Sequence, residues 1–265
     1  MKFFFAGAEN PTHFPVLEKL KMPYILMSYY NIRDRRNIEN YLKNCKKFGA
    51  EIMLDSGAHT LQKGKVSIDF DKYVDSYIDF LKKYGKYFEA FVELDVDNIV
   101  GLERVEKWTE KITKEVGRQP IVVWHRGRGF DYWKKMCEKY EYVGFSGFVS
   151  GTGQGEVPNK YVGIFLNVAK QNKTKVHGFG YTKPELVKRY NFYSVDSSSW
   201  LIGCRWGGVC VFNGKSLVMY SKKQFYEKYK KFNNLTNFDI NYFNASNWKR
   251  YSEYINEYWR TKNGI

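Results

Sequence analysis

The sequence predicts a single (β/α)₈ barrel, and three observations support this fold class. Eight short apolar runs recur along the chain, each nearly continuous in apolar character, as strands buried on both faces of a parallel sheet are. Amphipathic stretches separate the runs, and this alternation is typical of α/β folds. The chain has 265 residues, 43% of them hydrophobic, which is enough for one large core. An open doubly wound sheet is the alternative.

The predicted strands share aromatic and β-branched residues and a length of about four to nine residues. In chain order the runs are residues 2–7, 24–30, 51–57, 88–96, 120–125, 142–147, 175–180 and 192–196.

Helical periodicity fills several of the spacers between these strands. Residues 68–84 and 101–117 both repeat apolar side chains at a spacing of three to four, and the second stretch ends in a glycine. Residues 182–190 open with a threonine cap and an early proline. Residues 36–48 are similar, whereas the first spacer, 8–23, is a weak helix.

The alternation of apolar runs and amphipathic stretches ends near residue 205. We therefore divide it into a catalytic barrel, 1–205, and a C-terminal appendage packed on the barrel, 206–265. Residues 207–220 read as a hairpin with an Asn-Gly turn, and 247–259 as a helix. No linker or internal repeat separates the two parts.

The charge balance and the cysteine spacing indicate which class of partner and which cellular compartment to expect. Lys and Arg number 43 against 28 Asp and Glu, a net charge of +15, which favours nucleic acid as partner over a merely lysine-rich surface. The four cysteines form no C-x-x-C motif, so a reducing cytoplasm, bacterial or phage-infected, is expected. No apolar run approaches about 18 residues, so no membrane partner is expected.

Acidic residues close three of the predicted strands, at the end where barrels of this kind carry their chemistry. Asp55 stands in IMLDSGAHT, Asp95 in FVELDVD and Asp196 in YSVDSSSWLIG. A helix cap is the alternative for any one acid, but it explains three such endings less well. Other polar or small residues at the same predicted rim are Ser56, His59, Glu93, Asp97, His125, Ser146, Gly147, His177, Gly178, Gly180, Ser197 and Ser198.

Two chemistries fit this cluster. Metal-assisted hydrolysis needs His and Asp ligands, but only Asp95 and Asp97 have the i, i+2 spacing, and no H-x-H occurs. Carboxylate chemistry at an anomeric carbon needs no metal, because one Asp attacks C1′ of a sugar while another moves the proton.

Six short motifs, in family order, resemble the tRNA-guanine transglycosylase superfamily. The character of the chain is most similar to the phage and bacterial DNA 7-deazaguanine transglycosylases. The matching motifs are LDSGAHT (54–60), FVELDVD (91–97), VVWHRG (122–127), GFSGFVSG (144–151), VHGFGYTKPELV (176–187) and VDSSSW (195–200).

The resemblance implies a role for each matched residue. Asp196 would be the nucleophile, Asp55 the general acid and base, and Asp95 the reader of the base edge. Gly178 and Gly180 would let the backbone approach a flat ring. The implied reaction exchanges guanine in nucleic acid for a free 7-deazaguanine base, with no cofactor. The other residues expected to bind substrate are Ser56, His59, His125, Gly147 and Ser197.

The chain also departs from the family pattern. The C-x-C-x-x-C…H zinc site of the tRNA enzymes is reduced to Cys204 and Cys210, so we expect no metal. The chain lacks room for the RNA-binding domain of the archaeal enzymes, and His125 replaces a glutamine. DNA is therefore preferred over tRNA as the substrate.

Two basic segments are candidates for nucleic-acid contact. Arg126 and Arg128 lie in the glycine-rich stretch HRGRGF, where phosphate contacts are expected. The segment YSKKQFYEKYKKF interleaves lysines with aromatics, which suits backbone charge and base stacking, or a solvated helix face. A tRNA substrate, a metal-dependent hydrolase and a non-catalytic nucleic-acid-binding barrel remain the alternatives.

Overall fold

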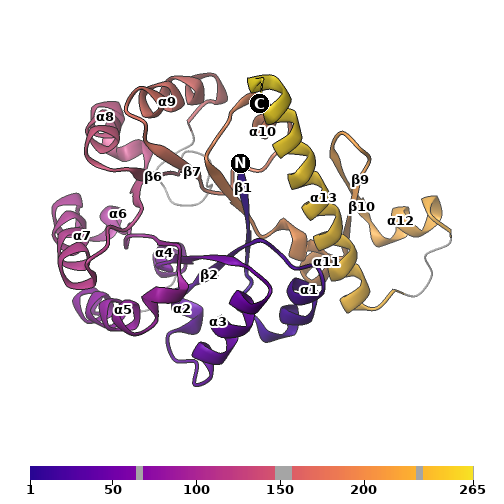
Figure 1. The fold of residues 1–265 in the computed structure, drawn as a ribbon, viewed down its shortest axis with the longest axis horizontal. Helices are drawn as coiled ribbons and strands as arrows, with labels where there is room; N and C mark the ends of the chain where they lie inside the picture. Colours follow the sequence, from indigo (N-terminus) through magenta and orange to yellow (C-terminus); the bar gives the residue numbers. More distant parts are fainter. Residues whose placement is uncertain (64–67, 147–156, 231–234, 265) are drawn as a thin grey trace.

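The computed structural model describes residues 1–63, 68–146, 157–230 and 235–264, and its eight parallel strands curl into a barrel surrounded by helices (Figure 1). The strands are β1 (Lys2–Ala6), β2 (Tyr24–Ser28), β3 (Glu51–Asp55), β4 (Ala90–Phe91), β5 (Val122–Trp124), β6 (Tyr142–Phe145), β7 (Lys175–Gly178) and β8 (Ser194–Ser197). Their spatial order is β4-β3-β2-β1-β8-β7-β6-β5. The predicted (β/α)₈ barrel is confirmed, within a single α/β domain.

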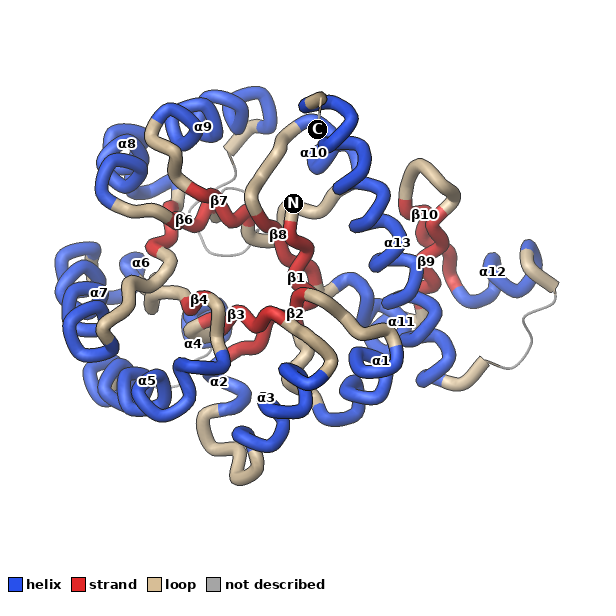
Figure 2. The backbone as a smooth tube through the Cα atoms, in the orientation of Figure 1, coloured by secondary structure: helices blue, strands red, loops and turns tan. Residues whose placement is uncertain are grey.

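The barrel closes where β4 meets β5, and Figure 2 shows the strands arranged around a common centre. Val92 and Ile121 form a parallel bridge. The Glu93 N–H donates to the Ile121 carbonyl at 3.0 Å, and the Ile121 N–H donates to the Phe91 carbonyl at 2.8 Å. The chain leaves the sheet directly afterwards, so β4 is shorter than the predicted run 88–96 and Asp95 lies in a loop.

The helices around the barrel largely follow the predicted spacers. Residues 68–84 and 101–117 contain the two longest of these helices, and Gly117 ends the second at a φ of 71°. The weak first spacer holds only short helices. In order the elements are η1 (Pro11–His13), α1 (Phe14–Lys19), α2 (Tyr29–Ile32), α3 (Ile38–Lys47), α4 (Ala58–Lys63), α5 (Phe70–Tyr84), η2 (Gly85–Tyr87), α6 (Asp97–Val100), α7 (Leu102–Val116), η3 (Arg126–Arg128), α8 (Gly129–Lys139), α9 (Asn159–Gln171) and α10 (Pro184–Arg189).

Side chains alternate between the two faces of the barrel wall. In β1, Phe3 and Phe5 join the large core between the sheet and the helices, whereas Phe4 joins a separate cluster. This second cluster fills the barrel interior and underlies the site described below. Its buried members are Phe4, Leu26, Met53, Val92, Ile121 and Val123.

The chain beyond β8 continues through η4 (Ser199–Leu201), α11 (Ile202–Trp206), β9 (Gly208–Phe212), β10 (Leu217–Ser221), α12 (Lys222–Lys228) and α13 (Asn237–Asn263). The predicted hairpin is present, with Gly214 of its Asn-Gly turn at a φ of 90°. The C-terminal helix α13 is longer than the predicted 247–259 and lies along the barrel beside α10 and α1 (Figure 1). No helix in the described ranges has the length and apolar character needed to cross a bilayer.

Candidate active site

A cavity of about 320 Å³ opens at the C-terminal ends of the barrel strands. It brings together residues from β2, β3, β5 and β8, from the helix α4, and from the segments that follow β4, β5, β6, β7 and β8. The three strand-end carboxylates singled out in the sequence all line it. The lining residues are Leu26, Asp55, His59, Gln62, Asp95, Val123, His125, Ser146, Phe179, Gly180, Asp196 and Ser198.

Asp55 ends β3 and carries a proton near neutral pH. Burial first, then the negative charge of Asp95 and, more weakly, that of Asp196, together raise the pKa of its carboxyl to about 7, against one hydrogen bond from the Gly57 N–H at 2.9 Å. Gly57 has a φ of 89°, and a Cβ there would lie 2.5 Å from Tyr30 Cβ. Only glycine therefore fits the turn that presents this N–H to Asp55.

Asp196 lies in β8, and its two hydrogen-bond contacts with described residues both involve the same carboxylate oxygen. Its Oδ1 accepts a hydrogen bond from the Gly180 N–H at 2.9 Å and lies 3.2 Å from His177 Nε2. Gly180 adopts a φ of 65°, which turns its N–H toward the carboxylate. Neither contact involves Oδ2, so the orientation of the carboxylate is fixed through Oδ1.

A chain of polar groups runs through the barrel interior beneath Asp196. The fully buried His177 places Nδ1 2.6 Å from Ser194 Oγ, and Ser194 Oγ lies 2.5 Å from the Tyr142 hydroxyl. The rings of Phe4 and Phe179 flank the imidazole. One consistent set of donors has Tyr142 donating to Ser194, Ser194 donating to Nδ1, and Nε2–H donating to Asp196.

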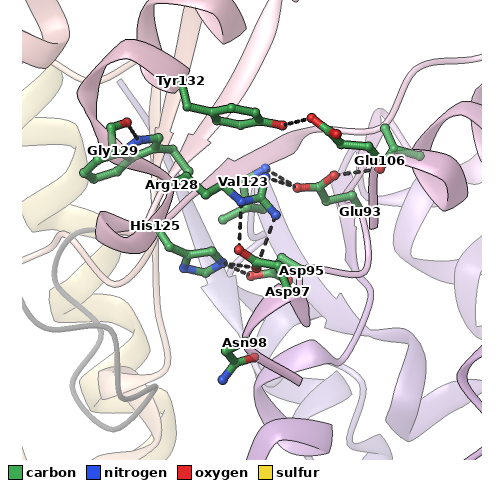
Figure 3. Close-up of polar contacts among 12 residues, drawn as sticks. Glu93, Asp95, Asp97, Asn98, Glu106, Val123, His125, Arg128, Gly129 and Tyr132 are labelled. Carbon is green, nitrogen blue, oxygen red and sulfur yellow. Dashed lines mark hydrogen bonds and ion pairs between the residues drawn. The ribbon is translucent and has the colours of Figure 1, made fainter. Parts of the chain in front are cut away.

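Asp95 and His125 form a second polar pair in the cavity wall (Figure 3). His125 Nε2 lies 2.9 Å from Asp95 Oδ2 and 3.9 Å from Asp97 Oδ1. Neither ring nitrogen of this buried histidine has a well-aligned hydrogen bond to any described residue. A buried polar group in this condition is available to a ligand that enters the cavity.

The prediction that Arg128 contacts phosphate is wrong, because its side chain is 1% exposed and already paired. Its Nη1 lies 3.0 Å from Glu93 Oε1 and its Nε 3.2 Å from Asp97 Oδ2 (Figure 3). Glu93 also accepts from the Val123 N–H at 2.8 Å. This ion cluster ties the loop after β4 to the loop after β5. Arg126, in the same turn, is exposed.

Three further residues predicted to bind substrate do not line the cavity. Ser56 is buried and its Oγ has no hydrogen-bond partner among the described residues. Ser197 Oγ accepts a hydrogen bond from the Ser199 N–H at 3.1 Å, which is a local turn contact. A Cβ on Gly178 would lie 3.0 Å from the Phe192 ring, so this glycine serves packing outside the cavity. Gly147 lies outside the described residues.

Sequence reasoning missed four lining residues: Leu26, Gln62, Val123 and Phe179. Gln62 follows His59 by one helical turn in α4, and its Nε2 donates to the Asp95 carbonyl at 2.6 Å. That spacing puts both residues on one helix face and was the available signal. Phe179 packs so closely on Gly144 that a Cβ there would lie 2.5 Å from its ring.

Comparison with known proteins adds no chemistry to this geometry. No protein-family model and no curated protein matches the chain. Within the described residues, no three His, Cys, Asp or Glu side chains gather as a metal ion would need.

Three solved structures illustrate the structural likeness. The chain resembles a GH10 endoxylanase retrieved from a sugarcane soil metagenome, with a TM-score of 0.43 and 12% identity over 67% of this chain and 65% of that one. It resembles GH5_18 from Bifidobacterium longum subsp. longum, with a TM-score of 0.45 and 12% identity over 74% and 69%. A D-psicose 3-epimerase gives a TM-score of 0.41 and 10% identity over 76% and 74%. Likeness this distant carries no argument about substrate or reaction.

Proposed function

We propose that this protein is a base-exchanging pentosyltransferase that replaces guanine in nucleic acid, preferably DNA, with a free 7-deazaguanine base. One observation supports the proposal most strongly. Two carboxylates with different surroundings face one cavity: Asp55 has a pKa raised to about 7, and Asp196 is oriented through one oxygen. Paired carboxylates in contrasting environments are the usual means of dividing acid and nucleophile roles at a sugar carbon.

In the first half of the reaction, Asp196 Oδ2 attacks C1′ of the target nucleotide. The bond from C1′ to guanine N9 breaks, and its electron pair leaves with the base. Protonated Asp55 gives its proton to the departing guanine, so a neutral base leaves. The sugar is then held as an ester on Asp196, after a transition state with oxocarbenium character.

In the second half, a 7-deazaguanine base occupies the vacated place. Its N9–H proton passes to the Asp55 carboxylate, N9 attacks C1′, and the ester electron pair returns to Asp196. Two inversions at C1′ restore the original configuration. A pKa of about 7 suits Asp55 to both proton transfers near neutral pH. Asp95 and His125 are placed to read the polar edge of the base.

The resemblance noted in the sequence supports the same assignment. The residues that it marks as nucleophile, acid–base group and base reader are Asp196, Asp55 and Asp95, and all three line this one cavity. An acidic cavity also suits a neutral base, whereas the positive net charge suits the nucleic acid around it.

The test is base exchange with labelled substrates. Purified protein is incubated with DNA or tRNA carrying radiolabelled guanine and with free 7-deazaguanine bases, and released label and nucleoside masses are measured. Asp196→Asn should bind DNA yet release no label and form no covalent adduct, whereas Asp55→Asn should form the adduct slowly. Asp79→Asn, on the exposed face of α5, is the matched control. Exchange by Asp196→Asn at the wild-type rate, or no exchange by the wild type on either nucleic acid, overturns the proposal.

A further inference from the structure

One segment of this protein combines several lysines with almost no acids. Some basic side chains of the barrel helices are paired with acids, as in Lys43 with Glu39 at 3.0 Å and Lys107 with Glu103 at 2.7 Å. In residues 206–230, which we name the basic arm, there are five lysines and a single acid, Glu227. None of these lysines has an ion pair within the described part of the chain; they are Lys215, Lys222, Lys223, Lys228 and Lys230.

An exposed tryptophan stands at the root of the basic arm. Trp206 ends α11, and its side chain is 83% exposed, the highest fraction among the exposed large hydrophobic residues of the described chain. Gly207 follows in the left-handed conformation, with a φ of 67°, and turns the chain into β9. The indole is therefore left free of the core that buries the other side of α11. An exposed indole face is a typical platform for base stacking.

The root of the basic arm follows the cavity residue Asp196 closely in the sequence. From Asp196 at the end of β8, the chain passes through η4 and α11 directly to Trp206. β9 runs away from this point and β10 returns, with Ser221 paired to Gly208. The Lys222 N–H then donates to the Gly207 carbonyl at 3.1 Å, so α12 begins beside Trp206 and projects away from the barrel (Figure 1).

We propose that the basic arm holds DNA beside the target nucleotide, with Trp206 stacked on a base and Lys222, Lys223 and Lys230 paired with phosphates. This inference rests on the proposed function and names the surface that receives its polymeric substrate. A cavity of about 320 Å³ inside a barrel admits a base only when the nucleotide is extruded from its duplex. Extrusion leaves the neighbouring bases with open faces, and the exposed indole of Trp206 can cover one of them.

The charge test compares two triple variants of the full chain. The arm variant is Lys222→Gln with Lys223→Gln and Lys230→Gln; Lys228 is spared because its Nζ donates to the Tyr220 hydroxyl. The control variant is Lys43→Gln with Lys107→Gln and Lys134→Gln, which removes three paired lysines from barrel helices. Affinity for a fluorescent DNA duplex is measured by anisotropy over a salt series. The arm variant should bind roughly tenfold more weakly, with a log–log salt slope less negative by about 2 to 3, and the control should match the wild type.

The stacking test uses Trp206→Ala and Trp206→Phe. One base–aromatic stack corresponds to an affinity loss of roughly 5- to 150-fold in the alanine variant, and phenylalanine should restore most of it. DNA that carries abasic sites on both sides of the target should bind the wild type and Trp206→Ala alike. Such a result would show that Trp206 acts by stacking on a base beside the target, and not through an indirect change in the shape of the binding surface.

Several outcomes overturn the docking proposal but leave the proposed base-exchange reaction intact. Wild-type DNA affinity in both the arm variant and Trp206→Ala does so, and so does a loss of binding to RNA but not to DNA. A wild-type dimer in sedimentation that Trp206→Ala dissociates assigns the indole to a second copy of the chain instead. Conversely, arm-dependent DNA binding by a wild type that exchanges no base upholds the docking surface and removes the proposed reaction. No DNA affinity at low salt removes both.

Discussion

Asp55 and Asp196 differ chiefly in the hydrogen bonds and charges that surround their carboxylates. Asp196 receives an N–H from Gly180 and faces an imidazole nitrogen of His177. Asp55 accepts one hydrogen bond, from the Gly57 N–H, but it is buried, and the negative charges of Asp95 and Asp196 raise its pKa. The same residue type is thereby prepared for two different tasks.

The raised pKa of Asp55 predicts a pH-dependent cost in stability. The carboxyl titrates near pH 7 in the folded protein and near its ordinary pKa of 3.8 when unfolded. A raised acid pKa means that the folded state binds the proton more tightly, so stability falls as pH rises from about 4 through 7. Asp55→Asn removes this cost, and its amide oxygen can still accept from Gly57. We expect the variant to be more stable than the wild type at pH 9 by up to about 4 kcal/mol.

Urea unfolding at pH 5 and pH 9 checks this expectation. At pH 5 the folded Asp55 is protonated but the unfolded one is mostly ionised, so the advantage of the variant should shrink to roughly two fifths of its value at pH 9. Asp79→Asn, an exposed substitution on α5, should show no comparable difference between the two pH values. An Asp55→Asn advantage that is equal at both pH values would contradict the raised pKa.

A second prediction at this scale concerns His177 as a positioning residue. Ser194→Ala removes the partner of Nδ1 while leaving the ring in place, so the Nε2–H tautomer that faces Asp196 is no longer enforced. We expect kcat to fall about 10-fold with little change in KM, and about 100-fold in His177→Phe, because only the attacking carboxylate loses its orientation. Tyr142→Phe keeps the serine–histidine contact and should change kcat least.

Nitrogen-15 NMR of the histidine ring gives a readout that does not depend on activity. The wild type should show His177 protonated at Nε2, and Ser194→Ala should show a mixture of tautomers. A single unchanged tautomer in Ser194→Ala, together with unchanged kcat, removes the positioning role.

At the scale of elements, strand order and the direction of strand ends were predictable from the sequence. Continuous apolar runs gave the parallel strands, and Asp55 and Asp196 were found because each closes such a run. Two of the expected substrate contacts, those of Ser56 and Ser197, conflict with the alternation of side chains along a strand. Ser56 follows Asp55 and Ser197 follows Asp196, and successive side chains on a strand point to opposite faces. Neither serine could share the cavity with its neighbour.

Arg128 could not have been placed from the sequence, because its partners are brought to it by the fold. Glu93 lies in the loop after β4 and Asp97 begins α6, both more than thirty residues earlier, and they reach Arg128 only where β4 and β5 close the barrel. In sequence, HRGRGF shows two equivalent arginines in a glycine-rich turn. Burial separates them: Arg128 points into the wall, and Arg126 is exposed.

The buried ion cluster at this closure predicts a large effect on stability. Arg128→Met leaves the Glu93 and Asp97 carboxylates buried without their cation, which costs about 3–5 kcal/mol in unfolding free energy. Arg126→Met, two residues away on the surface, should change it by less than about 0.5 kcal/mol. Thermal and urea unfolding of both variants checks the contrast. Equal stability of the two would show that the cluster does not hold the two loops together.

At the scale of the whole molecule, the C-terminal helix α13 connects the appendage with both ends of the barrel chain. The N-terminal ammonium of Met1 donates to Asn256 Oδ1 at 2.8 Å, and Trp259 Nε1 donates to the Val187 carbonyl at 2.8 Å. Asn244 donates to the Gly208 carbonyl and accepts from the Cys210 N–H, which fixes the hairpin of the basic arm to the same helix. The barrel and the appendage thus share one helix as a packing surface.

This arrangement predicts one cooperative unfolding transition for the entire chain. It also predicts that substitution of one tryptophan destabilises the protein strongly, whereas substitution of another does not. Trp259 is buried against α10, so Trp259→Ala removes a large apolar side chain and a hydrogen bond and should cost about 3–5 kcal/mol. Trp206 is exposed, so Trp206→Ala should leave the transition within about 0.5 kcal/mol of the wild type. Calorimetry and circular dichroism should give the same midpoint, because loss of α13 exposes the apolar surface of α1, α10 and α11 together. A separate, earlier transition for the appendage, with a folded barrel remaining after residues 207–265 are deleted, would instead show that the barrel is stable without α13.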